Sequence, residues 1–419
     1  MNTLIIVGLV LLLLFLRQPL LVILLAAIAA VHLLWGRGQL DYIIEDMWVS
    51  LDKELILAIP MFLLCGGAMT HGSTAQRLVN IATALTRAIP GGLGVAGILA
   101  CGVFAAISGS SIVTMIAIGS VMYPAMKKAG YNNRFALGAT MAGGTLGIVI
   151  PPSIPLIVYG LVTETSIVDL FLGGVGPGIL LLVLMSVWSM WANRHVPQQT
   201  FDFAEVRRAF REGIWAILMP VILLGGIYTG YFSATESAAV ALLYALLVEV
   251  FVHRSMKPSG FYQVVIDAAK LGGALFPLLA VALSLNLVLT EHRVPEMMVD
   301  MMKHWFDSPL TFMLAVNLLL LLVGCVMTTN EAILILAPLL APAAKAFGVD
   351  PVMFGIVMIV NLEIGLLTPP VGLNLLVAMS AFKQSFSEVV MGALPFIAIM
   401  LVALALISSQ PWISMGLVR

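Results

Sequence analysis

The side chains best suited to chemistry in this sequence are two groups of hydroxyls that interrupt long apolar runs. The first group is Ser108, Ser110 and Ser111, and the second is Thr328 and Thr329. Hydroxyl and carbonyl oxygens are hard ligands of the kind that hard metal cations prefer. We therefore interpret the two groups as the polar tips of two Na⁺-binding segments.

Each tip has a matching helix break further along the chain. Pro151–Pro152 and Pro369–Pro370 lie inside apolar segments, and each proline frees a carbonyl one turn earlier, near Gly147 and Gly365. Irregular backbone survives in hydrocarbon only where protein, an ion or a wet cavity satisfies its polar groups. The freed carbonyls are candidate Na⁺ ligands. Half-helices that restart after the breaks would direct their positive N-terminal ends at an anionic substrate.

The two tip-and-break units also share their spacing. From Ser110 to Pro151 is 41 residues, from Thr329 to Pro369 is 40, and a glycine stands four residues before each proline pair. Five predicted crossings separate the tips, so the second unit would enter the membrane from the opposite side. This is an inverted repeat, the arrangement in which secondary transporters hold substrate and coupling ions near the midplane. The alternative is ordinary proline kinks and small packing residues, which are common in membrane helices.

The composition shows that these units lie in a membrane. Of the 419 residues, 61% are hydrophobic and 10% are charged, against about 25% charged in soluble proteins. Apolar runs of about 18 residues or more, each enough to cross a bilayer, recur along the chain. The fold class is therefore an all-α polytopic membrane protein. The net charge of −1 gives no nucleic-acid footprint, and without a GxxxxGK loop or HExxH motif we expect a transporter that is not an enzyme.

The apolar runs predict ten spans and two hairpins. The spans are 3–16, 19–35, 54–70, 133–163, 168–192, 213–230, 234–252, 271–290, 351–381 and 388–409. Two longer stretches, 91–127 and 309–347, have a polar centre between two half-length helices. We interpret these two stretches as re-entrant hairpins, because each tip would enter and leave the membrane on one side.

These elements divide the chain into six predicted units. The predicted units are 1–90 (N-terminal scaffold helices), 91–192 (first repeat core, with hairpin 91–127 and broken helix 133–163), 193–212 (cytoplasmic connector), 213–308 (scaffold helices of the second repeat), 309–382 (second repeat core, with hairpin 309–347 and broken helix 351–381) and 383–419 (C-terminal helix). In the connector, Phe203, Val206 and Phe210 recur at helical spacing. Part of it could lie along the inner membrane surface, or it could be a plain solvated connector.

The distribution of basic residues predicts the orientation. With the N-terminus outside, 14 of the 20 Lys and Arg residues fall on the inner side, as the positive-inside rule requires. The first apolar run has no basic residue before it and Arg17 after it, which is the reverse of a cleaved signal peptide. We expect a retained first span, with both termini on the outer side of the membrane.

Acidic and amide side chains at membrane depth are further candidates. Glu331 follows the second tip directly, and Glu363 precedes the second break. Either could pair with a coupling ion or a proton, and Glu363 could equally make a structural hydrogen bond to a broken helix end. Glu236 and Glu249 lie nearer span ends, where we expect them to be interfacial. Of the two amides that flank the second break, Asn361 and Asn374, we expect Asn361 to contact the tip.

The residues assemble into two predicted Na⁺ sites and one substrate site. The first Na⁺ would bind at the first tip and break, with ligands among Ser108, Gly109, Ser110, Ser111, Gly147, Pro151 and Ser153. The second would bind at the other tip and break, with ligands among Thr328, Thr329, Asn330, Gly365, Thr368 and Pro369. A substrate carboxylate between the tips would contact Ser110, Ser111, Pro152, Asn330, Glu331, Asn361 and Pro370.

At these residues the sequence resembles a known family. The tip 108–111, the block Ile150-Pro-Pro-Ser-Ile154 and the block Asn361-Leu-Glu-Ile-Gly-Leu-Leu-Thr-Pro-Pro-Val-Gly372 are similar to the DctM-like large membrane subunit of TRAP (tripartite ATP-independent periplasmic) transporters, in the ion transporter superfamily. The resemblance covers nearly the whole chain.

The resemblance implies a Na⁺-coupled, elevator-type importer of organic acids such as C4-dicarboxylates, sialic acids, other sugar acids and keto acids in a bacterial inner membrane, so that both termini would face the periplasm. The hairpins and broken helices would form its moving transport domain, and the remaining spans its scaffold. The resemblance also implies two partners: a small four-helix membrane subunit, expected here as a separate chain, and a periplasmic substrate-binding protein. Two other classes stay open. A stand-alone anion/Na⁺ symporter would need no binding protein, and a purely structural membrane scaffold would need no polar tips.

Overall fold

The computed structural model describes residues 2–16, 18–34 and 40–418, and over these residues the chain is helical, with no strand. Seven of the described helices are long and apolar enough to cross a membrane. An eighth span results if two helices that meet at 113°, Val294–Trp305 and Pro309–Gly324, count as one. The prediction of an all-α polytopic membrane protein is confirmed. Arg17, which entered the orientation prediction, lies outside the described residues.

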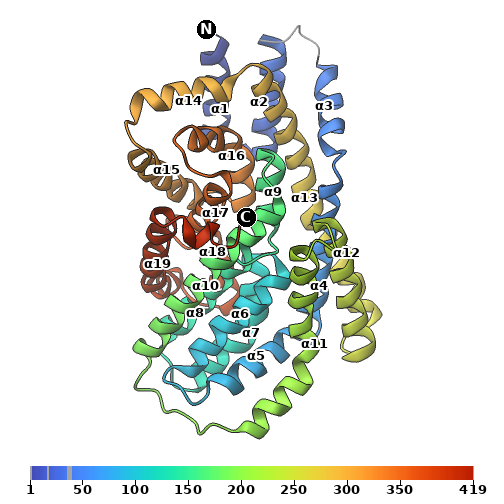
Figure 1. The fold of residues 1–419 in the computed structure, drawn as a ribbon, viewed down its shortest axis with the longest axis vertical. Helices are drawn as coiled ribbons and strands as arrows, with labels where there is room; N and C mark the ends of the chain where they lie inside the picture. The colour runs from blue at the N-terminus through green and yellow to red at the C-terminus, as the bar shows by residue number, and fades with distance from the viewer. Residues whose placement is uncertain (1, 17, 35–39, 419) are drawn as a thin grey trace.

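Of the five described N-terminal helices, three pack along one long helix from the middle of the chain. The five are α1 (Asn2–Phe15), α2 (Leu20–Leu34), α3 (Asp41–Leu51), α4 (Ala58–His71), which continues from a 3₁₀ turn (Glu54–Leu57), and α5 (Thr74–Thr86). Helices α2, α3 and α4 contact α13 (Pro258–Glu291), which runs down one side of the molecule (Figure 1). At the other end of the molecule, α5 passes beneath the first pair of hairpin helices.

The first hairpin and broken helix follow the predicted boundaries closely. The helices are α6 (Gly92–Ser108), α7 (Ser111–Lys128), α8 (Asn133–Val149), α9 (Ile154–Thr163) and α10 (Ile167–Ala192). Helix α8 packs against both α6 and α7, so that the hairpin and the broken helix form one block. The Pro151–Pro152 pair separates α8 from α9, as predicted.

The second half begins with long helices and ends with a second set of short ones. The middle helices are α11 (Phe203–Tyr228), α12 (Ala234–Leu247) with a π-helical turn (Val248–Val252), α13, and α14 (Val294–Trp305). They are followed by α15 (Pro309–Gly324), α16 (Thr329–Ala346), α17 (Pro351–Leu366), α18 (Leu373–Phe382), α19 (Phe386–Ser409) and α20 (Trp412–Met415). Helices α17 and α19 pack against α8 and α10, so the two halves interlock in the middle of the molecule (Figure 1).

Corresponding helices of the two halves begin in the same way. The Asn132 side chain accepts a hydrogen bond from the Arg134 amide at 2.9 Å at the start of α8. Asp350 accepts from the Val352 amide at 2.8 Å at the start of α17. Such caps satisfy N–H groups that the first helical turn leaves without partners.

The segment 193–212 is a connector only over its first half. Asp202 accepts hydrogen bonds from the Ala204 and Glu205 amides and starts α11 at Phe203. Val206 and Ala209 are buried against α5, whereas Phe203 and Phe210, which share the predicted helical spacing with Val206, are exposed. Residues 203–212 are therefore the first turns of α11 packed on α5, rather than a free connector.

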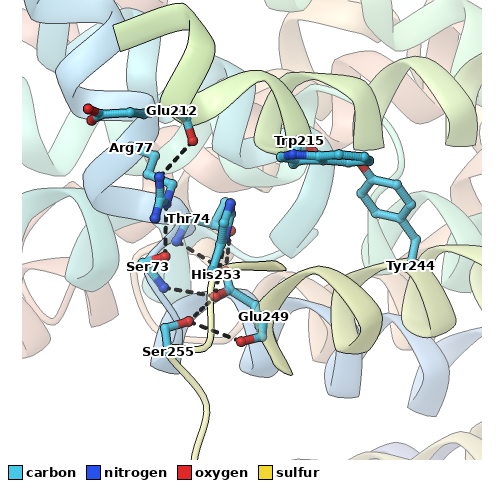
Figure 2. Close-up of polar contacts among 9 residues, drawn as sticks. All are labelled: Ser73, Thr74, Arg77, Glu212, Trp215, Tyr244, Glu249, His253 and Ser255. Carbon is cyan, nitrogen blue, oxygen red and sulfur yellow. Dashed lines mark hydrogen bonds and ion pairs between the residues drawn. The ribbon is translucent and has the colours of Figure 1, made fainter. Parts of the chain in front are cut away.

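The sequence analysis expected Glu249 to lie at the membrane interface, but the structure places it inside the protein. The side chain is completely buried at the end of α12, and its carboxylate accepts the Ser73 and Thr74 amides at 3.1 Å each (Figure 2). The hydroxyls of Thr74 and Ser255 also donate to it, and His253 Nδ1 lies 3.5 Å from Oε2. The carboxylate thus caps the positive N-terminus of α5, which offsets the cost of burying the charge.

A second contact ties the same helix to α11. Arg77 donates to the Ser73 hydroxyl at 3.0 Å and to the Glu212 carbonyl at 2.6 Å (Figure 2). The Tyr244 hydroxyl donates to the Trp215 carbonyl at 2.8 Å and joins α12 to α11 beside it. The start of α5 is therefore fixed to both α11 and α12.

Candidate transport site

The first tip is a tight turn between α6 and α7. Gly109 has φ of 57° in the left-handed region, Ser110 is extended, and α7 begins at Ser111. A side chain at Gly109 would meet the Pro152 carbonyl at 3.2 Å. The tip therefore lies directly against the first proline break, as the sequence analysis required of a joint site.

Most polar groups of the first tip bond to one another. The Ser108 hydroxyl lies 2.5 Å from that of Thr114 and accepts from the Ser110 amide at 3.4 Å. On α8, a side chain at Gly147 would come within 2.5 Å of the Ser110 carbonyl and the Thr114 hydroxyl. Gly147 is thus the residue that lets the broken helix approach the tip. The sequence analysis missed Thr114, although a lone hydroxyl one turn after Ser110 is a signal that could have found it.

The first break is buried, and its hydroxyl has a structural partner. Pro151, Pro152 and Ser153 are all buried, and the Pro151–Pro152 peptide bond is cis. The Ser153 hydroxyl accepts from the Leu156 amide at 3.4 Å and so caps the N-terminus of α9. This hydroxyl, predicted as a Na⁺ ligand, is engaged in starting a helix.

Residues of the second tip cap the N-terminus of the helix that follows, α16. The Thr328 hydroxyl accepts from the Glu331 amide at 3.4 Å, and Glu331 Oε2 accepts from the Thr328 amide at 3.0 Å. This reciprocal pair is a capping box. One carboxylate oxygen of Glu331 therefore has a structural role at α16.

The second break is more open than the first. Thr368 and Pro369 are half-buried, Pro370 is exposed, and their Pro–Pro bond is also cis. The Thr368 hydroxyl donates to the Ile364 carbonyl at 2.7 Å, and the Thr368 amide donates to the Gly365 carbonyl at 2.8 Å. The Gly365 carbonyl, predicted to be freed by the proline, thus already accepts one hydrogen bond. A side chain on Gly365 would meet backbone atoms of Gly324 at 2.5 Å, so the break packs on the second hairpin.

The two halves meet through an amide of the second break. Asn374, in the first turn of α18, donates to the Ser111 hydroxyl at 2.5 Å. Asn361 instead donates to Asn317 on α15, at 2.9 Å to the carbonyl and 2.7 Å to the side-chain oxygen. The prediction that Asn361 contacts the tip was wrong, because Asn361 lies five residues before the end of α17 and bonds to α15 instead.

Glu363 belongs to the same contact region. Its side chain is 0% exposed, and Oε1 accepts from the Thr329 hydroxyl at 2.9 Å. The Ser111 hydroxyl is also close enough to interact with this carboxylate. The sequence left open whether Glu363 makes a hydrogen bond to a broken helix end, and this bond is not the one that forms. Glu363 bonds to the second tip instead.

One cavity of about 310 Å³ brings both tips together. Its lining comes from the first tip (Ser110, Ser111, Ile112), the second tip (Thr328, Thr329, Asn330, Glu331), both breaks (Ile148, Leu366, Leu373) and the flank of α13 (Leu271, Ala274, Leu275, Leu278). Of the predicted substrate contacts, Ser110, Ser111, Asn330 and Glu331 line it, whereas Pro152, Asn361 and Pro370 lie outside the lining. The wall from α13 was not predicted, since its leucines look like ordinary span residues.

Two helix N-termini at this cavity have no side-chain cap. Ser110 makes no capping bond at the start of α7, and Gly372, with φ of 55°, has no side chain to cap α18. The Ser111 and Leu373 residues that begin these helices both line the cavity. Helix N-termini carry about half a positive charge and unpaired N–H groups, which attract anions. The cavity thus combines anion-attracting backbone with hydroxyl and amide oxygens that suit a small cation.

Fold and site together define a polytopic membrane protein with a transport-type cavity at the meeting point of two polar tips and two helix breaks. A family model described as "Tripartite ATP-independent periplasmic transporter, DctM component" matches residues 7–413. The chain belongs to this family. It is a large permease subunit of a TRAP transporter, and it is not an enzyme.

Individual relatives agree with this assignment, and a solved structure shares the fold. The chain is 41% identical over 382 residues to the C4-dicarboxylate TRAP transporter large permease protein DctM of Vibrio cholerae serotype O1, covering 86% of this chain and 84% of that protein. It is 38% identical over 388 residues to the isethionate TRAP transporter permease protein DctMQ of Oleidesulfovibrio alaskensis, covering 91% and 60%. The crystal structure of the Alcanivorax borkumensis YdaH transporter has a similar fold, with a TM-score of 0.63 at 14% identity, covering 99% and 98%.

Proposed function

We propose that this chain is the translocating subunit of a Na⁺-coupled secondary importer of organic acids, delivered by a periplasmic binding protein. The observation that carries the proposal is the single cavity lined by both tips, with two uncapped helix N-termini at its wall. A chain that only stiffened a membrane would have no use for this polar centre among apolar helices.

The substrate acid group is expected to bind between the starts of α7 and α18. The N–H groups of Ser111 and Leu373 and the amide of Asn330 supply donors there, and the leucines of α13 offer an apolar wall. The named relatives transport a C4-dicarboxylate and isethionate, which both carry an acidic group. We propose a C4-dicarboxylate, a sialic acid or a similar carboxylate as the substrate of this chain.

Na⁺ would supply the energy for uptake and neutralise the oxygen-rich tips. The first Na⁺ is proposed at the Ser110 and Gly147 carbonyl region and the second near the Asn330 side chain, whose Oδ1 is buried without a hydrogen-bond partner in the described chain. Hydroxyls already engaged in caps, such as Ser153, contribute to these sites less than the sequence suggested.

Transport would move one part of the molecule against the other. We propose that the two hairpins and broken helices form an inverted repeat and move together as an elevator. Their packing around α8 and α17 supports movement as one block. The long helix α13, which forms the far wall of the cavity, would belong to the stationary scaffold. In this arrangement both termini face the periplasm and the small four-helix subunit is a separate partner.

Uptake by proteoliposomes tests the proposal. The chain is reconstituted with its small subunit, and uptake of radiolabelled C4-dicarboxylates and sialic acid is measured with the binding protein outside. We expect uptake only with an inward Na⁺ gradient, and none when K⁺ replaces Na⁺. Equal uptake without the binding protein would support the stand-alone symporter, and uptake that ignores the Na⁺ gradient would overturn the coupling.

A further inference from the structure

The first turns of α11 expose two arginines that no carboxylate in the described part of the chain neutralises. Arg207 and Arg211 are both exposed, and neither side chain makes an ion pair or a hydrogen bond with another described residue. Arg208, by contrast, lies 3.9 Å from Glu212. Like charges four residues apart on a helix repel each other. The pair formed by Arg207 and Arg211 therefore lacks the counter-charge that its neighbour has.

Apolar side chains share the exposed face with these arginines. Phe203 is 72% exposed, and Phe210 and Ile214 are exposed as well. With 3.6 residues per turn, these three residues and Arg207 lie within about 60° of one another around the helix, and Arg211 lies next to them. Another face of the same turns packs on α5. A helix face that mixes arginines with large apolar side chains is typical of segments that lie at a membrane surface.

The chemistry of α11 changes along the helix in the same order as a bilayer. Residues 203–212 include five charged side chains, whereas residues 213–228 include none. Trp215, at the change, is exposed, and so is Val221 further along the apolar part. Tryptophan is enriched where headgroups meet hydrocarbon, and arginines near helix ends extend toward the headgroups. A bilayer imposes this order along a helix, whereas a protein partner does not, so lipid is the occupant that fits the face.

The neighbouring helix ends with the same combination of side chains. Trp191, in the last turn of α10, is exposed, and the guanidinium carbon of Arg194 lies 5.9 Å from the centre of its ring. The connector from α10 to α11 crosses the lower end of the molecule, and α11 begins there (Figure 1). Exposed arginines beside aromatic rings therefore recur on two helices that contact each other.

We propose that the face of α11 formed by Phe203, Arg207, Phe210, Arg211 and Ile214 binds the headgroup of an anionic phospholipid. The planar guanidinium groups of the two arginines donate to the phosphate oxygens, a geometry in which arginine forms two parallel hydrogen bonds. The phenyl rings and Ile214 contact the upper part of the acyl chains. The bound phosphate supplies the counter-charge that the arginine pair lacks and so stabilises the start of α11. This site is separate from the Na⁺ and substrate sites, and its failure would leave the proposed import unchanged.

A lipid titration of the purified full-length chain in nanodiscs tests this face. Phosphatidylglycerol replaces phosphatidylcholine stepwise at constant ionic strength, and the melting temperature is measured together with the number of phosphatidylglycerol molecules retained in native mass spectrometry. For the wild type we expect the melting temperature to rise with the phosphatidylglycerol fraction. We expect this rise to shrink as salt is added, because salt screens exposed charges.

Single and double arginine variants locate the site. We expect Arg207→Gln and Arg211→Gln each to weaken the phosphatidylglycerol response about fivefold, as the loss of one arginine near an anionic surface predicts. The double variant should lose the response and one retained lipid, with an unchanged or higher melting temperature in pure phosphatidylcholine, because the repulsion within the pair is gone. Arg208→Gln removes the same charge at the neighbouring position that is paired with Glu212, so it is the matched control and should respond as wild type.

A protein partner on this face gives a different result. The double variant would then co-purify with less of the small membrane subunit while its phosphatidylglycerol response stayed as in the wild type, and that outcome overturns the inference. Equal weakening in all three single variants would show a response to net charge alone and overturns it as well. If the double variant does not fold, the single variants Arg207→Gln and Arg211→Gln decide, and wild-type responses in both overturn the inference.

Discussion

The first proline break is buried and starts its following helix with a side-chain cap, whereas the second is partly exposed and starts its helix at a glycine. Ser153 caps α9, and the residues around it are buried. Gly372 leaves α18 without a side-chain cap, and Pro370 beside it is exposed. Two breaks that share a glycine and a Pro–Pro pair at the same spacing therefore present different chemistry to their surroundings.

At the hairpin tips the capped helix start lies in the second half and the uncapped one in the first, the reverse of the pattern at the breaks. In the first half Ser110 leaves α7 uncapped, and in the second half the Thr328 and Glu331 pair caps α16. Of the two helices that follow the tip and the break in each half, one thus has a side-chain cap and the other has none. The two uncapped starts meet through the bond from Asn374 to Ser111, at the wall of the cavity. The comparison shows that each half of the chain contributes one uncapped helix start to the cavity wall.

The largest effect is expected from filling the space between the second break and its hairpin. In Gly365→Ala the new methyl group would lie 2.5 Å from the Gly324 backbone, and backbone cannot rotate away as a side chain can. Overpacking of this kind costs about 1–3 kcal/mol or more, so we expect a lower melting temperature and loss of uptake. Gly225→Ala on α11, where nothing lies within 4 Å, is the control. Wild-type uptake by Gly365→Ala would show that the second break does not pack as described.

A pair of serine variants separates the capped start from the uncapped one. Ser111→Ala removes the acceptor of the Asn374 bond at the cavity wall, and we expect uptake to fall about tenfold, which corresponds to about 1.4 kcal/mol. Ser153→Ala removes only a cap, which costs about 1 kcal/mol of stability, and uptake per folded transporter should persist. Initial uptake rates and melting temperatures of both variants measure this. Equal loss of uptake in the two would contradict the distinction between the uncapped start of α7 and the capped start of α9.

The second tip provides a milder test. Thr328→Ala breaks the capping box at α16, and we expect a stability loss of about 0.5–2 kcal/mol. The melting temperature of the purified chain measures it. Thr328→Ser retains the hydroxyl and should restore most of the loss. If both variants lower the melting temperature alike, the cap is not what stabilises this tip.

The smallest effect is expected at Asn361. Asn361→Asp replaces the donor that bonds Asn317 on α15, with atoms 2.7 Å apart, outside the cavity lining. We expect the melting temperature to fall, since a buried hydrogen bond contributes about 0.5–1.5 kcal/mol, and the apparent affinity for substrate to stay unchanged. A change in the substrate concentration at half-maximal uptake would return Asn361 to the substrate site.

The sequence predicted local features well because they depend on local chemistry. Pro151–Pro152 and Pro369–Pro370 interrupt helices wherever they occur, so α8, α9, α17 and α18 begin and end close to the predicted residues. Hydroxyls in the apolar runs marked both tips for the same reason. The packing of the first turns of α11 on α5 was not predicted, since a hydropathy pattern does not show which helix a buried face contacts.

By itself, the sequence determined the class of protein, the positions of the breaks and tips, and their repetition, because hydropathy and proline chemistry act within a few residues. Only the tertiary structure decided which polar group meets which. Asn374 rather than Asn361 reaches the first tip, Glu363 bonds the second tip, and Glu249 caps α5. These contacts join residues from distant parts of the chain, and their geometry follows from how whole helices pack rather than from spacing along the sequence.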